Sequence, residues 1–521
     1  MRFLKKTAAA AVVVSAFLLA ACGGTKTDTP QREPKETEKS GVEEMISALK
    51  EEETKDPMEG DGRAQIEIGT AEELAQFRDR VNGGEAALDA VLTADIDLSS
   101  VCGEGVGDWI PFEEYNGVFD GNGHEISGLC IAGEDSDSGA LFKKIGFTGV
   151  VKNLEITGAR IQVTSTAAAL AMRNEGTVEN CSSRDGYIKG YEAYGLLGES
   201  MEESTVSGCH VSGTVEGGGR AAGIVGFLYS AAVSDCYNEA AVSTEKQQEW
   251  AAGISCSAST SQITDCCNGG TVTGAWDTAG VVGTAAKGSV ITGCYNTAAI
   301  SGKGRVSGIA AMMGESVLNR CYNMGPVSGV NGTAGILATT KGSTPQSKCV
   351  VANCFNRGEI SAGQLCAGVA IGANCVTVNS YNLGSVISGN GGIYGAAGVS
   401  DRGGIMSGDQ VETFLLSSYS AGTLSEKAGG LTYSDTMTEM NTVFYQDDTA
   451  AGYYFNRKDG GQDASHAVSA EQFASGEVLE QLNAYVDSGA ALPEGCAKAA
   501  EAVTLDHWKA GNDGYPALEW E

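Results

Sequence analysis

The sequence predicts an all-β protein, a right-handed parallel β-helix in which a solenoid of about 27-residue coils carries a short α-helical cap at each end. Three observations favour this fold. The composition, with 73 glycines but only 7% aromatic residues in 521, favours short strands and tight turns over long helices. A motif anchored on cysteine in seven copies and on serine in two recurs between residues 181 and 418, and a glycine-containing motif keeps step with it. Self-similarity at a fixed period of this size is typical of solenoids.

The first 22 residues have the organisation of a lipoprotein signal peptide. MRFLKK is positively charged, and the apolar run TAAAAVVVSAFLLAA that follows is short for a membrane span. Leu19-Ala20-Ala21-Cys22 resembles the lipobox of bacterial lipoproteins, which implies cleavage before Cys22 and acylation of its thiol. The resemblance predicts an extracytoplasmic, outward-facing protein that is lipid-anchored to the bacterial cell membrane through Cys22. The alternative is a secretory signal that contains a cysteine by chance.

Residues 23–63 predict a disordered acidic spacer. Thr, Pro, Glu and Lys dominate this stretch, where 12 acidic residues face 7 basic ones, and no face can bury apolar surface. The whole chain is acidic as well, with 66 acidic and 34 basic residues. This balance excludes a nucleic-acid partner, because phosphate backbones are bound by clustered Lys and Arg.

Residues 64–138 predict an N-terminal cap and the first coils. In GTAEELAQFRDRVNGG, Thr70 and Glu73 stand in capping-box positions, and Gly83 is placed to end the helix in a left-handed conformation. Strand patterns flank this helix, AQIEI before it and VLTADIDLSS after it. The apolar face of the helix consists of Leu74, Phe77 and Val81.

Residues 139–445 carry the repeats. Successive anchors of the first motif stand 26 to 38 residues apart. The second motif reads AGIVG at 222, AGISC at 252 and AGVVG at 279, and its central glycine argues against a helical repeat. A period of about 27 residues suits one coil of a three-sided parallel β-helix. The anchors are Cys181, Cys209, Cys236, Cys266, Cys294, Cys321, Cys354, Ser380 and Ser418.

The repeats and their flanks resemble a known family. FDGNGHEISGL at 119–129, GALFKKIGFTGVVKNLEITGARI at 139–161, the CYN and AGI units and a closing W-x5-GYPAL at 508–518 are similar to bacterial surface proteins with GLUG-type repeats on a pectin-lyase-like β-helix. The resemblance covers about residues 64 to 521. It implies the β-helix architecture and an adhesin-like place on the cell surface, and it implies no particular activity.

Residues 446–521 predict a C-terminal cap. In SAEQFASGEVLEQLNAYV, Ser469 and Gln472 stand in capping-box positions, and Phe473, Val478 and Leu482 are available for burial. An open β-helix end would present unpaired strand edges, so we expect this segment to cover that end.

The anchor cysteine and the asparagine two residues later predict a structural ladder. The asparagine stands at one position in six successive coils, where side-chain amides bond from coil to coil, and the cysteines act as small apolar fillers. A zinc site is disfavoured, because single cysteines along a rod do not converge and the four histidines lie far apart in sequence. The asparagines are Asn238, Asn268, Asn296, Asn323, Asn356 and Asn382.

The residue directly after the anchor is aromatic in six copies. If the anchor points inward, this aromatic side chain points outward, and an exposed ladder of rings suits binding of carbohydrate or protein. The aliphatic residue three before the anchor breaks that alternation, so a bend intervenes at a place that the sequence does not reveal, and burial of the rings is the other interpretation. The ladder consists of Tyr237, Tyr295, Tyr322, Phe355, Tyr381 and Tyr419.

These observations predict a non-catalytic binding or adhesive module whose partners are the membrane, through acylated Cys22, and glycans or host or cell-surface proteins. The alternatives are a polysaccharide-degrading lyase or glycoside hydrolase and a structural envelope spacer. Lyases of this type need clustered carboxylates for calcium and a basic side chain that abstracts a proton, and hydrolases need paired carboxylates on adjacent coils. None of the acidic stretches repeats an Asp at one position in neighbouring coils beside an Arg or Lys. No metal or cofactor is predicted, apart from weak calcium binding at residues 134–137 or in Asp120-Gly121-Asn122-Gly123, which otherwise predicts a tight turn.

Overall fold

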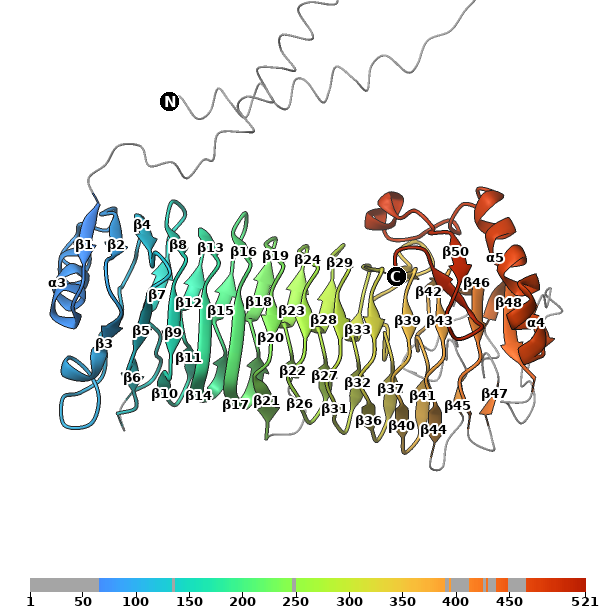
Figure 1. Cartoon of the computed structure of the whole chain (residues 1–521), viewed down its shortest axis with the longest axis horizontal. Coiled ribbons are helices and arrows are strands. Elements are labelled where there is room, and N and C mark those ends of the chain that lie inside the picture. Colours follow the sequence, from blue (N-terminus) through green and yellow to red (C-terminus); the bar gives the residue numbers. More distant parts are fainter. Residues whose placement is uncertain are drawn as a thin grey trace, which may run out of the picture. The chain divides into compact units, whose positions relative to one another are not determined.

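The computed structural model describes residues 65–133, 136–245, 250–388, 393–394, 412–424, 428–429, 437–447 and 465–521. These residues form an all-β parallel solenoid of about 12 turns, as the repeats predict (Figure 1). None of the helices in the described part of the chain has the length and apolar character that a membrane crossing requires. Cys22, its acylation and the spacer at residues 23–63 lie outside the described residues.

Strands stack in register from coil to coil. One sheet contains 42 strands and a second contains 7, and Tyr295 lies beside Tyr322 just as Ile300 lies beside Val327. A central coil consists of β27 (Asp277–Ala279), β28 (Val282–Ala286), β29 (Val290–Thr292), β30 (Tyr295–Asn296) and β31 (Ile300–Ser301). The next coil repeats it with β32 (Arg305–Ser307), β33 (Ala310–Met313), β34 (Val317–Asn319), β35 (Tyr322–Asn323) and β36 (Val327–Gly329).

A left-handed residue directly before the anchor makes the bend that the alternation requires. Val233 and Cys236 are both buried although they are three residues apart, because Asp235 between them has a φ of 52° and turns the chain. Tyr237 then points outward and Asn238 inward. The positive φ recurs in other coils, at Asn153, Asn180, Gly208, Asp265, Gly293, Arg320, Asn353 and Asn379.

The glycine of the second motif makes room for the asparagine of the first. A Cβ added at Gly280 would lie 2.1 Å from the carbonyl oxygen of Gly308 and 2.7 Å from Cγ of Asn296. One coil earlier, Gly253 approaches Asn268 in the same way. The two motifs keep step because each glycine lets the backbone pass close to one asparagine.

The N-terminal cap begins as its sequence predicts. Oγ1 of Thr70 accepts a hydrogen bond from the Glu73 N–H, and the Glu73 carboxylate accepts one from Gly69. The left-handed stop predicted at Gly83 is wrong: Gly83 has a φ of -78° because its N–H still bonds back into the helix, and Gly84 turns the chain at a φ of 113°. The elements here are β1 (Ile66–Ile68), α3 (Ala71–Asn82), β2 (Ala90–Leu92) and β3 (Ile96–Asp97).

The C-terminal segment packs against the side of the last coils (Figure 1). It comprises α4 (Ala470–Ser475), α5 (Glu477–Asp487), β50 (Trp508–Ala510) and β51 (Pro516–Leu518). Arg320 and Arg357, from different coils, form ion pairs with Asp506 and Asp513. The segment thus covers a lateral face of the last coils. Burial of the outward-pointing rings on this face stabilises the packing.

Ser469 caps α4 with a complete capping box. Its hydroxyl accepts from the Gln472 N–H, and the Gln472 side chain accepts from the Ser469 N–H. We expect Ser469→Ala to lower the local stability of α4 by about 1 kcal/mol, since a backbone N–H loses its partner. Hydrogen exchange of α4 measures the change, and Ser469→Thr, which keeps the hydroxyl, is the control. Unchanged exchange in the alanine variant would contradict this assignment.

Candidate functional site

The asparagines of the repeat form a continuous chain of buried amide hydrogen bonds. Nδ2 of Asn268 donates to Oδ1 of Asn296 at 2.7 Å, and Nδ2 of Asn296 donates to Oδ1 of Asn323 at 2.8 Å. Nδ2 of Asn296 also donates to the Ala298 carbonyl at 2.9 Å. These side chains are fully buried, so the ladder joins the coils and presents no surface to a ligand. Further links join Asn238 to Asn268, Asn323 to Asn356 and Asn356 to Asn382.

The anchor cysteines line the inside of the solenoid as free thiols. Sγ of Cys294 donates to the carbonyl oxygen of Ile263, one coil away, at 3.5 Å. Burial raises the pKa of the Cys294 thiol, which keeps it protonated and unreactive at neutral pH. The same buried place is taken by Cys181, Cys209, Cys236, Cys266, Cys321 and Cys354.

The residues that follow the anchors form an aromatic ladder on the outside of the coils. The ring centroids of Tyr295 and Tyr322 are 4.7 Å apart, and the rings are inclined by only 5°. Phe355 stacks on Tyr322 at 4.9 Å, and Tyr381 stacks on Phe355 at 5.0 Å. Tyr419 lies 5.0 Å beyond Tyr381. The in-register column extends past the predicted residues, to His210 at one end and to Phe444 and His466 at the other.

The C-terminal part of the ladder is covered by the protein itself. The Trp508 ring lies 6.0 Å from that of Tyr381 and 5.8 Å from that of Tyr419, and both tyrosines are fully buried. Trp520 packs on Phe355 at 5.7 Å and touches Tyr322 at 5.9 Å. Phe355, Tyr381 and Tyr419 therefore belong to a second hydrophobic core between the coils and the C-terminal segment, and Tyr322 lies partly buried at its edge.

The N-terminal part of the ladder is open. Tyr237 is 37% exposed, and His210, Tyr295 and Tyr322 are half-buried. His210 stacks on Tyr237 at 5.4 Å, so the stack begins one rung before the first tyrosine. We refer to His210, Tyr237, Cys267, Tyr295 and Tyr322 as the open strip.

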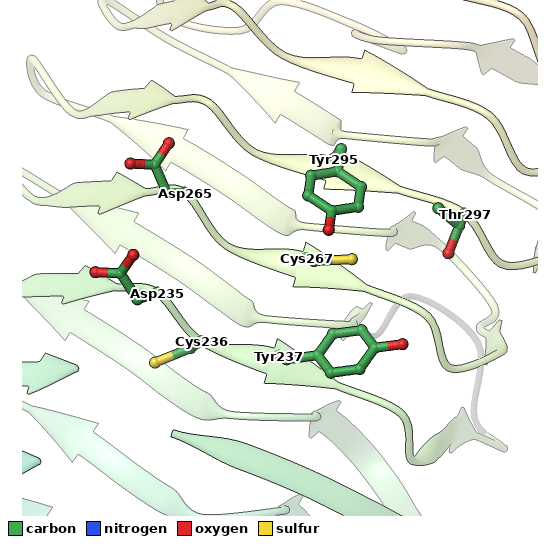
Figure 2. Close-up of a pocket in the computed structure, with 7 residues that line it drawn as sticks. All are labelled: Asp235, Cys236, Tyr237, Asp265, Cys267, Tyr295 and Thr297. Carbon is green, nitrogen blue, oxygen red and sulfur yellow. The ribbon is translucent and has the colours of Figure 1, made fainter. Parts of the chain in front are cut away.

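The open strip is hollowed where Cys267 takes the place of an aromatic residue. Figure 2 shows Cys267, on β25 (Cys267–Asn268), between Tyr237 and Tyr295 of the coils on either side. The small side chain leaves a shallow hollow of about 390 Å³. The hollow is lined by Asp235, Cys236, Tyr237, Asp265, Cys267, Tyr295 and Thr297.

The thiol and the phenol in this hollow stay protonated at neutral pH. Burial raises the pKa of the Cys267 thiol to about 11. A hydrogen bond with Cys267, and secondly burial, raises the pKa of Tyr295. Because neither group is a thiolate or a phenolate, neither is an activated nucleophile or base. The hollow also offers rings, hydroxyls and the carboxylates of Asp235 and Asp265 from neighbouring coils, which are groups that can contact a ligand.

A second hollow, of about 540 Å³, continues the open strip at Tyr322. It shares Thr297 with the first hollow. At its far side Arg357 faces Glu521, with 3.7 Å between Nη2 and Oε2. The strip therefore ends where the C-terminal segment begins to cover the ladder.

A different column of the coils carries acid–base pairs. Glu192 lies beside Arg220, and Asp277 beside Arg305, on neighbouring coils, so each pair joins one carboxylate to one guanidinium. The paired residues stand at one repeat position, three residues before the glycine of the second motif. Arg305 binds both oxygens of Asp277, which is fully buried, and burial raises the pKa of that carboxyl. A buried carboxylate held by its own arginine is a structural ion pair and has no access to a polysaccharide.

The structure describes only one of the two candidate calcium-binding stretches in full. Asp120-Gly121-Asn122-Gly123 forms a tight turn, in which Oδ1 of Asp120 accepts from the Asn122 N–H at 2.8 Å. Residues 134 and 135, in the other candidate, lie outside the described residues. Within the part of the chain that is described, no three His, Cys, Asp or Glu side chains converge as a metal site.

Curated relatives match only short stretches of the sequence. No family model matches the chain. It is 36% identical over 98 residues to a "Putative Gly-rich membrane protein" of Evansella cellulosilytica, which covers 18% of this chain and 11% of that protein. It is 30% identical over 95 residues to "Halomucin" of Haloquadratum walsbyi, which covers 18% of this chain and 1% of that protein. The chain thus spans a small part of the length of either relative.

Among the solved structures that match is the crystal structure of a "putative immunoglobulin A1 protease" from Bacteroides ovatus. The match covers 89% of this chain and 94% of that chain, at 16% sequence identity and a TM-score of 0.23. A TM-score this low supports no argument about shared architecture or activity.

Proposed function

We propose that the protein is a lipid-anchored, outward-facing binding module of the cell surface, without catalytic activity, and that it holds glycan chains along the open strip. The observation that carries this proposal is the unequal cover of one aromatic ladder. Its C-terminal rungs are buried under Trp508 and Trp520, whereas Tyr237 and Tyr295 stay open beside a hollow. A contiguous exposed aromatic surface is typical of a place where a partner binds.

The chemistry of the open strip favours a glycan. A sugar ring has apolar C–H faces and a hydroxyl edge, and a tyrosine matches both with its ring and its own hydroxyl. Thr297 and the exposed carboxylates of Asp235 and Asp265 add hydrogen-bonding groups along the same strip. Because carboxylates repel like charge, a neutral or amine-bearing chain fits better than one rich in uronic acids.

The predicted anchor and spacer suit this role. An acylated Cys22 would attach the chain to the membrane surface. Residues 23–63, fully extended, would reach about 130 Å, which is enough to hold the strip clear of the bilayer. The names of the two relatives, a membrane protein and Halomucin, support a place at the cell surface for this chain as well.

Alanine at Tyr295 tests the binding role. We expect Tyr295→Ala in the full-length protein to weaken the affinity for neutral oligosaccharides about tenfold or more, because a central aromatic residue carries much of a binding contact. Isothermal titration in detergent with oligosaccharides chosen from a glycan array measures the affinity. Tyr191→Ala, which removes an exposed tyrosine outside the strip, is the control. Equal affinities of the two variants would exclude the strip as the site.

A depolymerisation assay on the same glycans separates binding from catalysis. The full-length protein is expected to leave the viscosity of the polysaccharide unchanged and to release no unsaturated or reducing sugars. A loss of viscosity would replace this proposal by the enzymatic alternative.

A further inference from the structure

The aromatic stack of the open strip is interrupted at Cys267. Tyr295 is covered on one face by Tyr322, at 4.7 Å and 5°, and Tyr237 is covered on one face by His210, at 5.4 Å and 9°. Cys267 stands between Tyr237 and Tyr295 in the register. Within the described residues, the faces that these two tyrosines turn toward Cys267 therefore have no ring stacked on them.

In the register of the ladder, one ring is missing between Tyr237 and Tyr295. Tyr237 and Tyr295 are two coils apart, which is about 9.6 Å for strands stacked in a sheet. Rings of this ladder stack at 4.7 to 5.0 Å, so one further ring fits midway between two tyrosines at that distance. The hollow of about 390 Å³ lies at this rung.

The rim of the gap is acidic. Asp235 and Asp265 belong to neighbouring coils, and Figure 2 shows their carboxylates in a column beside the column of rings. In the part of the chain that the structure describes, neither carboxylate forms a hydrogen bond or an ion pair, and no Lys or Arg lines the hollow. Two neighbouring carboxylates without a cation favour a positively charged ligand.

We propose that the Cys267 rung is a subsite for one amino-sugar ring, a hexosamine whose amine is free and protonated. The pyranose ring lies between Tyr237 and Tyr295, and its ammonium group faces Asp235 and Asp265. The tyrosine rings add cation–π attraction to the charge contacts. This inference rests on the proposed function, because it adds a subsite selective for ring and charge to a strip that holds glycan chains.

Three oligosaccharides of equal length test the selectivity for charge: a glucosamine oligomer with free amines, its N-acetylated form and a uronic acid oligomer. We expect the full-length protein to bind the amine form about tenfold or more tighter than the N-acetylated form, and the uronic acid form most weakly. Raising the salt concentration is expected to shrink the preference, because these charges are exposed. The double variant Asp235→Asn with Asp265→Asn is expected to lose the preference and to keep its affinity for the N-acetylated form. Equal affinity of the native protein for both forms would overturn the inference.

A variant that fills the gap at residue 267 tests whether a sugar ring binds between Tyr237 and Tyr295. Cys267→Phe is expected to abolish the preferential binding of the amine oligomer, whereas Cys267→Ala, which keeps the gap, retains it. Preferential binding of the amine oligomer that survives in a folded Cys267→Phe protein would overturn the inference. If that protein does not fold, the binding preference of the aspartate double variant tests the subsite instead. Failure of the subsite differs from failure of the proposed function. In the first case oligosaccharides bind through Tyr295 without preference, and in the second none bind.

Discussion

Replacing Asn296 by leucine is expected to lower the free energy of unfolding of the central coils by about 3–5 kcal/mol. The change removes the amide that receives a hydrogen bond from Asn268 and donates to Asn323 and to the Ala298 carbonyl. Three polar groups then each lose one hydrogen bond, of which the Asn268 amide keeps its other bond, to the Gly270 carbonyl. Leaving a buried polar group without a partner costs about 1–3 kcal/mol. Leucine has a similar volume, so the cost reflects hydrogen bonding more than packing.

Denaturant titration combined with hydrogen exchange of β29 to β36 measures this effect, because coils of a solenoid unfold with their neighbours. Asn331→Ala, at a surface asparagine that bonds the Lys303 carbonyl, is the control and is expected to change stability by less than about 0.5 kcal/mol. A loss below about 1 kcal/mol in Asn296→Leu would show that the ladder contributes little.

Asn296→Asp keeps the shape of the side chain and changes its hydrogen bonding, so it tests the hydrogen-bonding contribution to stability alone. Burial raises the pKa of the introduced carboxyl above its unfolded value of about 3.9. The folded state then holds a proton that the unfolded state has released, so stability falls as pH rises from about 3.9 to the folded pKa. The aspartate variant is therefore expected to be most stable in acid, where a neutral carboxyl can still donate to Asn323.

Periodicity made the coil predictable, because a residue that returns every turn occupies one place in the fold. The asparagine and the glycine are readable in this way, since Gly280 and Asn296 restrict each other sterically in each repeat. The bend before the anchor was missed although the sequence carries a signal for it. Its left-handed position is held by Asn, Asp or Gly in most coils, such as Asp235, Gly293 and Asn353, and these residue types adopt a positive φ most readily. Arg320 is an exception.

The site was predictable in its position and not in its exposure. Tyr237 and Tyr295 follow the anchor and point outward, as the pattern indicates, and reading the same position in the other copies also finds His210 and Cys267. Which rungs are covered depends on Trp508, far along the chain and outside the repeat. A contact of this kind has no period, so the sequence carries no signal for it.

Replacing Trp508 by alanine is expected to detach the C-terminal segment from the ladder while the coils stay folded. The indole ring lies against Tyr381 and Tyr419, and its Nε1 donates to Oδ1 of Asn379 at 2.7 Å in a buried place. Truncation of a buried tryptophan costs about 3–5 kcal/mol. The segment lacks the in-register neighbours that support each coil, so the loss is expected to appear as local opening.

Hydrogen exchange should therefore quicken in α5 and β50 and stay slow in β29 to β36. Trp276→Ala, at a tryptophan that is 38% exposed on another part of the coils, is the control and is expected to change neither. If hydrogen exchange quickened equally along the whole solenoid, the C-terminal segment would not open independently of the coils.

Opening of the C-terminal segment also lengthens the exposed ladder by the rungs of Tyr381 and Tyr419, which follow Phe355 in an unbroken stack. Because that stretch contains no gap like the one at Cys267, the variant should bind no second amino-sugar ring, and its stoichiometry with the amine oligomer should remain that of the native protein.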